Sequence, residues 1–506
     1  MFLVGITVAI WLIGAGIAAI PRIAVGRAAR AAVAIGVFGV LAAGVLLVIQ
    51  GTGAVRVGWF AAIAAVFVAG LSVWIQNFSV AHLRADTRQR WFVIWVNVLT
   101  AASIGVVLSP SVLWFAAAWS VTGAALLLLL ATYPASRQAR QGIARTAAQL
   151  ATGDIALWLA SAALAAAAGG DVTWSRLGAA TGALPGWAAV SVALLLVVAG
   201  ASRAAQVPFH TWLPVTLAAP TPVSAIMHAG LVNAAAFLVI RFSDTITAHP
   251  AAVILLAVCG AASMLSGAAG YLVRPDLKGR LVASTTAQMG FMLVTLSVGA
   301  WGAAVFHLMG HGIYKATLFL RAGDHIDEKR RARSAPAAAP ASARRRATAG
   351  AVAVVVPGLG IAAAVLLLAA PVTTSGLLLA AYGWTTVAVL LSGVLTHGGW
   401  PGWARILAVP AAVAVTAVYV AIVHAFDVLV SSDIPAALRP VPGWAVLVPL
   451  LLAGGMSLLP RLRAGRAARA YGWLTLLAGA PVPRLRPRRT ARPASPITPS
   501  PVQEIA

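Results

Sequence analysis

Long apolar runs alternate with short polar segments along almost the whole of this 506-residue sequence. The first run, MFLVGITVAIWLIGAGIAAI at 1–20, is followed by similar runs as far as residue 460. A helix of about 20 apolar residues crosses the ~30 Å hydrocarbon core of a membrane. Because lipid offers no hydrogen-bond partners, the main-chain polar groups of such a segment must bond to one another, as they do in an α-helix. The pattern therefore predicts an all-α, polytopic membrane protein.

The apolar runs predict about fifteen transmembrane helices. The first is interpreted as a helix and not as a cleaved signal peptide, because no basic segment precedes its apolar residues and further spans follow it. The seventh run is unusually long and is interrupted at Pro208. The expected spans are 1–20, 31–49, 58–79, 91–108, 111–131, 146–168, 187–218, 221–241, 250–273, 281–299, 301–320, 349–370, 374–396, 404–426 and 443–460.

The composition agrees with this class of protein and argues against others. The chain is 61% hydrophobic and 9% charged, whereas soluble domains carry about 25% charged residues. The net charge of +25 is a feature of some nucleic-acid-binding proteins. Here, however, the arginines lie in short segments between apolar runs, which argues against that function. The one cysteine, Cys259, lies inside an apolar run, which excludes disulfides and cysteine-based metal sites.

The basic residues are distributed unevenly between the two ends of the predicted helices. Thirty of the 36 lysines and arginines lie in segments on one side. Two lie inside spans, and four lie on the other side: Arg56, Arg176, Arg241 and Arg439. Cytoplasmic loops carry the excess of basic residues in membrane proteins. We therefore expect a multi-pass protein of the bacterial inner (cell) membrane, with its amino terminus outside and its carboxyl terminus in the cytoplasm.

Two stretches do not have the character of membrane helices. Residues 326–347, IDEKRRARSAPAAAPASARRRA, are charged and rich in Ala, Pro and Ser, which indicates a flexible cytoplasmic linker. Residues 461–506 form a basic tail that is rich in Pro and Arg beyond residue 480, and this composition is typical of disorder. The tail could be solvated or could lie on anionic lipid.

Three titratable residues are spaced four apart in the span 301–320. His307, His311 and Lys315 therefore stack along one face of the predicted helix. Ionisable groups inside a membrane are costly and usually functional or paired. Imidazole exchanges protons near neutral pH, and a buried lysine can act as a base, so this row could pass a proton. A structural polar seam bonded to a neighbouring helix is the alternative interpretation.

The segment 208–233, PFHTWLPVTLAAPTPVSAIMHAGLVN, contains four prolines that break or kink helices. Broken helices inside membranes line cavities and mark ion sites in transporters. Arg203 lies just before the break, His210 just after it, and His228 in the following span. His228 could connect Arg203 to the row in 301–320, although a single buried histidine is often structural.

Asp154, in the segment ATGDIALW, is the one carboxylate deep inside a predicted span. It is the expected counter-ion of Arg203. The pair could be purely structural, or it could open and close and so gate a charge. Because arginine does not release its proton in proteins, Arg203 would be a fixed charge and Lys315 the titrating one.

These motifs resemble the antiporter-like membrane subunits of the proton-translocating transporter family. That family includes chain L of NADH–quinone oxidoreductase and the large subunits of multisubunit cation/proton antiporters. The resemblance covers about residues 70–325, and its most specific motifs are PFHTWLP…APTPVSAIMHAG, STTAQMGFML at 284–293 and HGIYKATLFLRAG.

The resemblance implies two inverted five-helix repeats, each with a broken helix, the second break falling at Pro357-Gly358. The chain would then comprise N-terminal helices in 1–90, a first repeat in 91–241, a second repeat in 250–396 interrupted by the linker 326–347, C-terminal helices in 404–460 and the tail 461–506. In the family, a lysine on the broken helix, a histidine on the next helix and a further lysine form the proton path. They correspond here to Arg203, His228 and Lys315, and Asp154 matches a Gly-Asp motif.

The sequence also departs from the family pattern. The family's Trp-Glu pair is Trp119-Ser120 here, the first lysine of the path is Arg203, and no lysine follows Lys329. Within the family, Arg203 together with MHAGLVN, AQMGFM and LFLRAG is most similar to the DabB-type subunits of inorganic carbon accumulation systems.

That resemblance implies a subunit that translocates a cation and drives a DabA-like zinc-containing partner to hydrate CO2 to bicarbonate. Catalysis would belong to the partner, so this chain is expected to be no enzyme, with no cofactor and no metal. Two alternatives are a proton-pumping subunit of an NADH–quinone oxidoreductase-like or antiporter complex, and a membrane scaffold whose ion path has decayed. Carboxylates are the usual Na+ ligands, and only Asp154 is deep, which favours H+.

Overall fold

The computed structural model describes residues 2–53, 57–134, 137–323, 342–368, 374–396 and 400–431, together with Asp433 and Trp473. The described residues are helical or lie in turns and loops, apart from one isolated bridge between Ser111 and Thr173. The all-α class predicted from the apolar runs is therefore confirmed.

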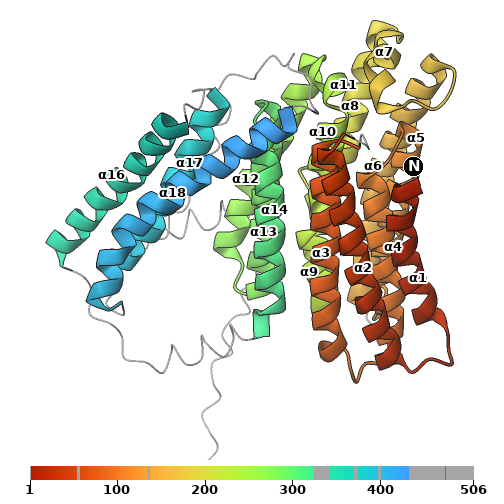
Figure 1. Ribbon diagram of the computed structural model, residues 1–506, viewed down its shortest axis with the longest axis horizontal. Coiled ribbons are helices and arrows are strands. Elements are labelled where there is room, and N and C mark those ends of the chain that lie inside the picture. The colour runs from red at the N-terminus through yellow and green to blue at the C-terminus, as the bar shows by residue number, and fades with distance from the viewer. Residues whose placement is uncertain are drawn as a thin grey trace, which may run out of the picture.

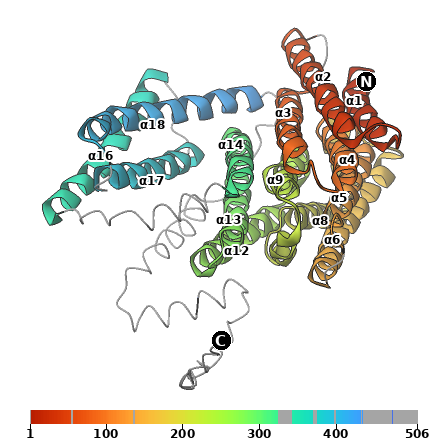
Figure 2. The same cartoon turned by 90° about the horizontal axis from the view of Figure 1, so that it is seen from below.

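Most of the helices form one bundle of upright, roughly parallel or antiparallel rods, shown from the side in Figure 1 and from below in Figure 2. Successive long helices run in opposite directions, as expected for a chain that crosses a membrane repeatedly. The bundle consists of α1 (Phe2–Ala19), α2 (Val25–Gly51), α3 (Trp59–His82), α4 (Gln89–Val107), α5 (Val112–Leu130), α6 (Arg137–Ala168), α8 (Gly186–Arg203), α9 (Thr221–Ala229), α10 (Ala234–Arg241), α12 (Pro250–Val273), α13 (Leu277–Ser297) and α14 (Trp301–Leu320).

Short helical segments lie between these rods. They are η1 (Trp174–Arg176) and α7 (Leu177–Gly182) after α6, η2 (Phe209–Trp212) and η3 (Pro214–Ala218) after α8, η4 (Leu231–Asn233) between α9 and α10, and α11 (Ser243–Thr247) before α12. The helix interruption predicted at Pro208 is confirmed, since α8 ends at Arg203 and α9 begins only at Thr221.

A second group of helices lies beside the bundle: α16 (Ala343–Leu368), α17 (Thr374–Thr396) and α18 (Gly402–Ser431). In both views α18 runs across this group and reaches the bundle next to α14 (Figures 1 and 2). The ring of Tyr419 contacts that of Phe306 in α14 at 5.7 Å, and two carboxylates near the C-terminal end of α18 add hydrogen bonds. The main-chain N–H of Gly302, in the first turn of α14, donates to Asp427 at 2.9 Å. That of Phe60, in the first turn of α3, donates to Asp433 at 2.8 Å.

The interior of the bundle is closely packed and largely aliphatic. Where α12 crosses α13, the glycines of the two helices face each other, and a Cβ atom built on Gly260 would lie 2.7 Å from the carbonyl oxygen of Gly290. Large apolar side chains cover the outside of the molecule, for example Phe38 at 63% exposed and Leu367 at 85%. An apolar exterior around a small-residue contact is typical of helices packed in lipid.

Ten of the described helical segments are long and apolar enough to cross a membrane. Every expected span before residue 430 falls on a described helix, but the count of about fifteen helices predicted from run lengths is not confirmed. The expected span 443–460 lies outside the described residues. So does the tail 461–506, except for Trp473.

Two details differ from the expectations. First, α16 is continuous through Pro357, so the break expected at Pro357-Gly358 is absent. Proline removes only one helical hydrogen bond, and neighbouring helices make such a loss tolerable in a membrane. Second, α16 begins at Ala343, so the last residues of the expected linker are helical, while 326–341 lie outside the described residues.

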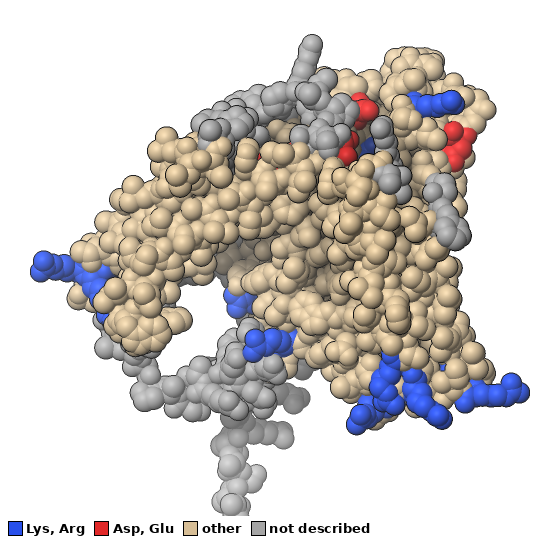
Figure 3. Space-filling view, in the orientation of Figure 1, with Lys and Arg blue, Asp and Glu red and all other residues tan. Residues whose placement is uncertain are grey.

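The charged side chains are segregated along the bundle axis. Figure 3 shows many of the visible lysine and arginine side chains at the bottom of the bundle, with others at the left edge and at the top right, and the visible acidic side chains towards the top. This separation matches the asymmetry counted along the sequence.

Candidate functional site

The break after α8 places a charged side chain inside the bundle. α8 ends at Arg203, Ala205 takes a left-handed backbone conformation with φ of 52°, and Pro208 follows without an N–H to donate. The side chain of Arg203 is 1% exposed. At a helix C-terminus the unpaired carbonyls carry partial negative charge, which favours a cation at this position.

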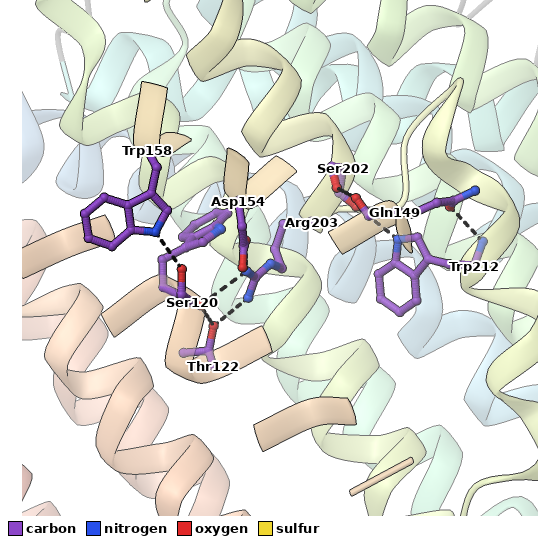
Figure 4. A network of polar contacts seen from close by, with 9 residues as sticks. Ser120, Thr122, Gln149, Asp154, Trp158, Ser202, Arg203 and Trp212 are labelled. Carbon is purple, nitrogen blue, oxygen red and sulfur yellow. Dashed lines mark hydrogen bonds and ion pairs between the residues drawn. The ribbon is translucent and has the colours of Figure 1, made fainter. Parts of the chain in front are cut away.

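Arg203 has an ion-pair partner and two further hydrogen-bond acceptors (Figure 4). Its Nη2 lies 2.7 Å from Oδ1 of Asp154 on α6 and donates to the Trp119 carbonyl at 3.2 Å, while Nη1 donates to Oγ1 of Thr122 at 2.5 Å. The guanidinium also stacks on the Trp119 ring at 4.5 Å. The ion pair expected from the sequence is thus present, and the buried charge is compensated and hydrogen-bonded, as such charges must be.

A second network fixes the break itself (Figure 4). Ser202 donates to the carbonyl of Gln149 on α6 at 2.6 Å, and the main-chain N–H of Trp212 donates to the Gln149 side chain at 3.1 Å. The indole N–H of Trp212 donates to the Ser202 carbonyl at 3.0 Å. These bonds hold α6, the end of α8 and η2 together. The Arg203–Asp154 pair therefore lies beside a hydrogen-bonded junction of these three elements.

The position after Trp119 is occupied by a neutral group. Ser120, which replaces the family's glutamate, accepts a hydrogen bond of 3.1 Å from the indole N–H of Trp158 (Figure 4). The acidic partner of Arg203 comes from Asp154 instead. The negative charge beside this site is thus supplied by α6 rather than α5.

The row predicted on 301–320 exists as one face of α14. The rings of His307 and His311 are 5.7 Å apart, and Lys315, one turn further, is 0% exposed. Nζ of Lys315 donates to Oγ of Ser284 at 2.5 Å and to the carbonyl of Leu281 at 3.2 Å, both on α13. Among the described residues, no carboxylate forms an ion pair with Lys315.

His228 joins this row from the neighbouring helix. Nε2 of His311 lies 3.2 Å from the main-chain oxygen of His228, and the His228 ring stacks on Phe319 of α14 at 4.4 Å and 9°. The predicted span containing His228 is itself interrupted: α9 ends at Ala229, and η4 separates it from α10.

Each imidazole of this group has a buried ring nitrogen without a partner in the part of the chain that the structure describes. These atoms are Nδ1 of His228, Nδ1 of His311 and Nε2 of His307. Buried polar atoms are normally hydrogen-bonded to protein or to ordered water. Three unpaired imidazole nitrogens beside a buried lysine are therefore suited to accept and release protons.

The Arg203–Asp154 pair is separate from the group formed by His228, His307, His311 and Lys315. Within the described residues, no hydrogen bond or ring contact joins Arg203 to His228, so the bridge expected through His228 is not formed by direct contact. A cavity of about 70 Å³ lies nearby, and none of Arg203, Asp154, His228 or Lys315 lines it. Its lining includes Trp119 and Thr122, which bond Arg203, and Gly230 and Asn233 between α9 and α10. Most of the other lining side chains are apolar. His210, in η2, contacts neither group in the described residues.

Several residues of the site escaped the sequence analysis. Thr122, Gln149 and Phe319 carry no signal in a single sequence, because a threonine, glutamine or phenylalanine inside an apolar run is common. Ser284 could have been found, since it is the first residue of STTAQMGFML. In the described part of the chain, no cluster of three or more His, Cys, Asp or Glu residues could hold a metal ion.

A multi-span helical bundle, a helix broken beside a buried ion pair and a buried His-His-Lys row together define an antiporter-like membrane subunit. Residues 109–397 match the NADH:quinone oxidoreductase/Mrp antiporter transmembrane family. The chain belongs to that family.

Two relatives carry a more specific name, and both come from Halothiobacillus neapolitanus. The probable inorganic carbon transporter subunit DabB2 is 33% identical over 383 residues, which are 75% of this chain and 67% of the relative. The probable inorganic carbon transporter subunit DabB1 is 33% identical over 291 residues, 56% of this chain. The match covers 52% of DabB1, so this chain spans about half the length of that relative.

The fold is also similar to that of a solved structure, the Mrp complex from Dietzia sp. DQ12-45-1b. The TM-score is 0.56 at 23% sequence identity, and the similarity covers 93% of this chain and 52% of the solved chain. This likeness confirms the antiporter-like fold expected from the sequence motifs.

Proposed function

We propose that this chain is the cation-translocating membrane subunit of an energy-coupled inorganic carbon pump, and that the cation is H+. The observation that carries the proposal is the buried row His307–His311–Lys315, joined to His228 and lying in a chain similar to probable inorganic carbon transporter subunits. A membrane interior holds such groups only where they are compensated or functional.

In the proposed mechanism the six site residues have different roles. Lys315 binds and releases the proton. His307 and His311 pass it along α14, and His228 passes it from α9. Arg203 stays charged and sets the electrostatic field at the broken helix, while Asp154 compensates it and gates the charge when the pair loosens.

Protons are favoured over Na+ as the transported ion. A sodium ion requires several oxygen ligands, among which carboxylates are usual. Asp154, the deep carboxylate, is already engaged by Arg203 at 2.7 Å. The histidines and Lys315 instead offer imidazole and amine nitrogens, which are proton carriers.

The chain would act together with a partner and would itself catalyse no reaction. We infer a stable complex with a DabA-like zinc-containing subunit that hydrates CO2 to bicarbonate, in the bacterial inner membrane. Affinity purification from the native host should recover a large zinc-containing polypeptide, detected by metal analysis. Recovery of this chain alone, with full carbon uptake, would contradict the partnership.

The alternative function is that of a proton-pumping subunit in an NADH–quinone oxidoreductase-like complex or a multisubunit antiporter. The family match over residues 109–397 and the likeness to the Mrp complex favour it. Purification would separate the two functions, because the alternative predicts several further membrane subunits in place of one zinc protein.

Substitution of Lys315 tests translocation directly. Lys315→Ala removes the titrating amine, and Lys315→Arg keeps a charge that does not release its proton. Both should abolish growth at ambient CO2 in a host that depends on this system, with normal protein level and partner association. The control is Lys278→Arg, the same exchange in the first turn of α13, which should grow like the wild type. Normal growth of Lys315→Arg would limit Lys315 to a structural role.

A further inference from the structure

A second cavity, of about 490 Å³, opens between α12, α13 and α14, away from the Arg203 group. Three of its lining residues follow one another along a single face of α13, one turn apart: Arg280, Ser284 and Gln288. Tyr271 of α12 and Tyr314 of α14 form the other walls. Its volume falls in the range of small-ligand sites in proteins, which is roughly 300–1,000 Å³.

The charge around this cavity is entirely positive. Arg280 lies in the lining, its guanidinium 4.4 Å from the centre of the Tyr271 ring. Lys315 lies directly behind the wall, because Nζ bonds to Ser284 and Leu281, which both line the cavity. The lining contains no aspartate or glutamate. Asp276, one turn before Arg280, caps α13 by accepting the N–H of Gly279 at 2.5 Å, and it forms no ion pair within the described residues.

Lys315 is fully buried and Arg280 is half-buried at the start of α13, and neither has a carboxylate ion pair in the described residues. A buried charge in a membrane protein must be compensated, and a small anion beside Arg280 and Ser284 would supply negative charge next to Lys315. Guanidinium and ammonium groups bind oxyanions through short, charge-assisted hydrogen bonds. Lipid tails cannot hydrogen-bond to the polar side chains of Arg280, Ser284 and Gln288 on α13.

We propose that this cavity is a binding site for a small oxyanion, held by Arg280 on the face of α13 that also bonds Lys315. Its identification with bicarbonate rests on the function proposed above, whereas the anion site itself does not. The same chemistry could come from a free anion or from a lipid phosphate group. The anion would act as an exchangeable counter-ion of Lys315, so that inorganic carbon binding and proton release would influence each other.

Cysteine labelling tests the sign of the charge without requiring transport. The full chain has one cysteine, so Cys259→Ala gives a background for Ala287→Cys, whose side chain lines the cavity beside Ser284. The rates of modification by anionic sulfonatoethyl and cationic trimethylammonioethyl methanethiosulfonate are compared in vesicles of neutral lipid. Ser175→Cys, exposed in the middle of η1, is the reference.

We expect the anionic reagent to be favoured at Ala287→Cys by about tenfold or more relative to the reference, as the attraction of unit charges at this range predicts. Arg280→Gln should remove most of the preference. Lys315→Arg, which preserves both charges, should retain it while abolishing transport, so that failure of the site and failure of the proposed function are distinguishable. Equal rates, a cationic preference, no labelling, or no effect of Arg280→Gln would each overturn the anion site.

The source of the anion is identified in the same assay. Sodium bicarbonate should slow labelling at Ala287→Cys more than sodium chloride of the same ionic strength. If phosphatidylglycerol vesicles slow it and bicarbonate does not, the oxyanion is a lipid phosphate, and the assignment to bicarbonate is overturned.

Discussion

His311 and His228 are joined by a hydrogen bond that determines which ring nitrogen of His311 carries a proton. Nε2 of His311 lies 3.2 Å from the main-chain oxygen of His228. A carbonyl oxygen can only accept, so Nε2 must be the N–H donor, and in the neutral ring Nδ1 is the free base. That atom is buried and has no partner among the described residues. It is therefore the position at which His311 can take up a proton.

His311→Gln separates this role from packing. The glutamine amide can still donate to the His228 carbonyl, but it cannot exchange a proton. We expect normal folding and a loss of proton flux of at least about tenfold, in line with the ~10²–10⁴-fold effects of proton-transfer groups. Flux is measured with a pH-sensitive dye in vesicles. His82→Gln, at the end of α3, is the control, and undiminished flux in His311→Gln would remove His311 from the path.

Asp154→Asn should lower stability as well as transport. The substitution leaves Arg203 buried without its counter-charge, a loss of roughly 3 kcal/mol. The double variant Asp154→Leu/Arg203→Met removes both charges and should recover most of the stability without recovering transport. Thermal unfolding of the detergent-solubilised protein measures the first effect, and proton flux the second. If Asp154→Asn unfolds at the wild-type temperature, the ion pair is not a stabilising element.

The attachment of α18 to the bundle should depend on its two carboxylates. Asp427→Asn and Asp433→Asn weaken the caps on α14 and α3, each by about 1 kcal/mol. The sites are on different helices, so the effects should add in the double variant. Hydrogen exchange at the first turns of α14 and α3 measures the loss of protection, with Asp244→Asn in α11 as the control. Unchanged exchange in the double variant would show that other contacts hold α18.

The uneven distribution of basic residues predicts the orientation of the chain. A green fluorescent reporter fused after residue 460 should fluoresce, because that position is expected in the cytoplasm. Alkaline phosphatase fused at the same position should be inactive. Periplasmic phosphatase activity there would refute the expected alternation of spans.

The class of protein and the helix break could be predicted from the sequence because both follow from local physics. Run length determines whether a helix can span a membrane, and the closely spaced Pro208, Pro214 and Pro220 disfavour one continuous helix. The pairing of Arg203 with Asp154 was also predictable, since a buried arginine needs an anion and the spans offered one carboxylate. The spacing of His307, His311 and Lys315 required only the periodicity of the helix.

Contacts that depend on how separate helices pack against one another could not be predicted from the sequence. Thr122 binds Arg203 because α5 passes beside the end of α8, and no feature of the sequence around Thr122 indicates this. The separation of Arg203 from His228 has the same origin. The continuity of α16 through Pro357 shows the limit of a local rule, because the neighbours of a helix decide whether a proline kinks it or breaks it.

The attachment of α18 has a mechanical consequence. The C-terminal half of this 30-residue helix lies against the bundle, from the ring contact of Tyr419 with Phe306 to the bonds of Asp427 and Asp433. Phe306 directly precedes His307 in α14. A force applied to α18 would therefore be transmitted through Phe306 and the first turn of α14 to the helix that carries the histidine row.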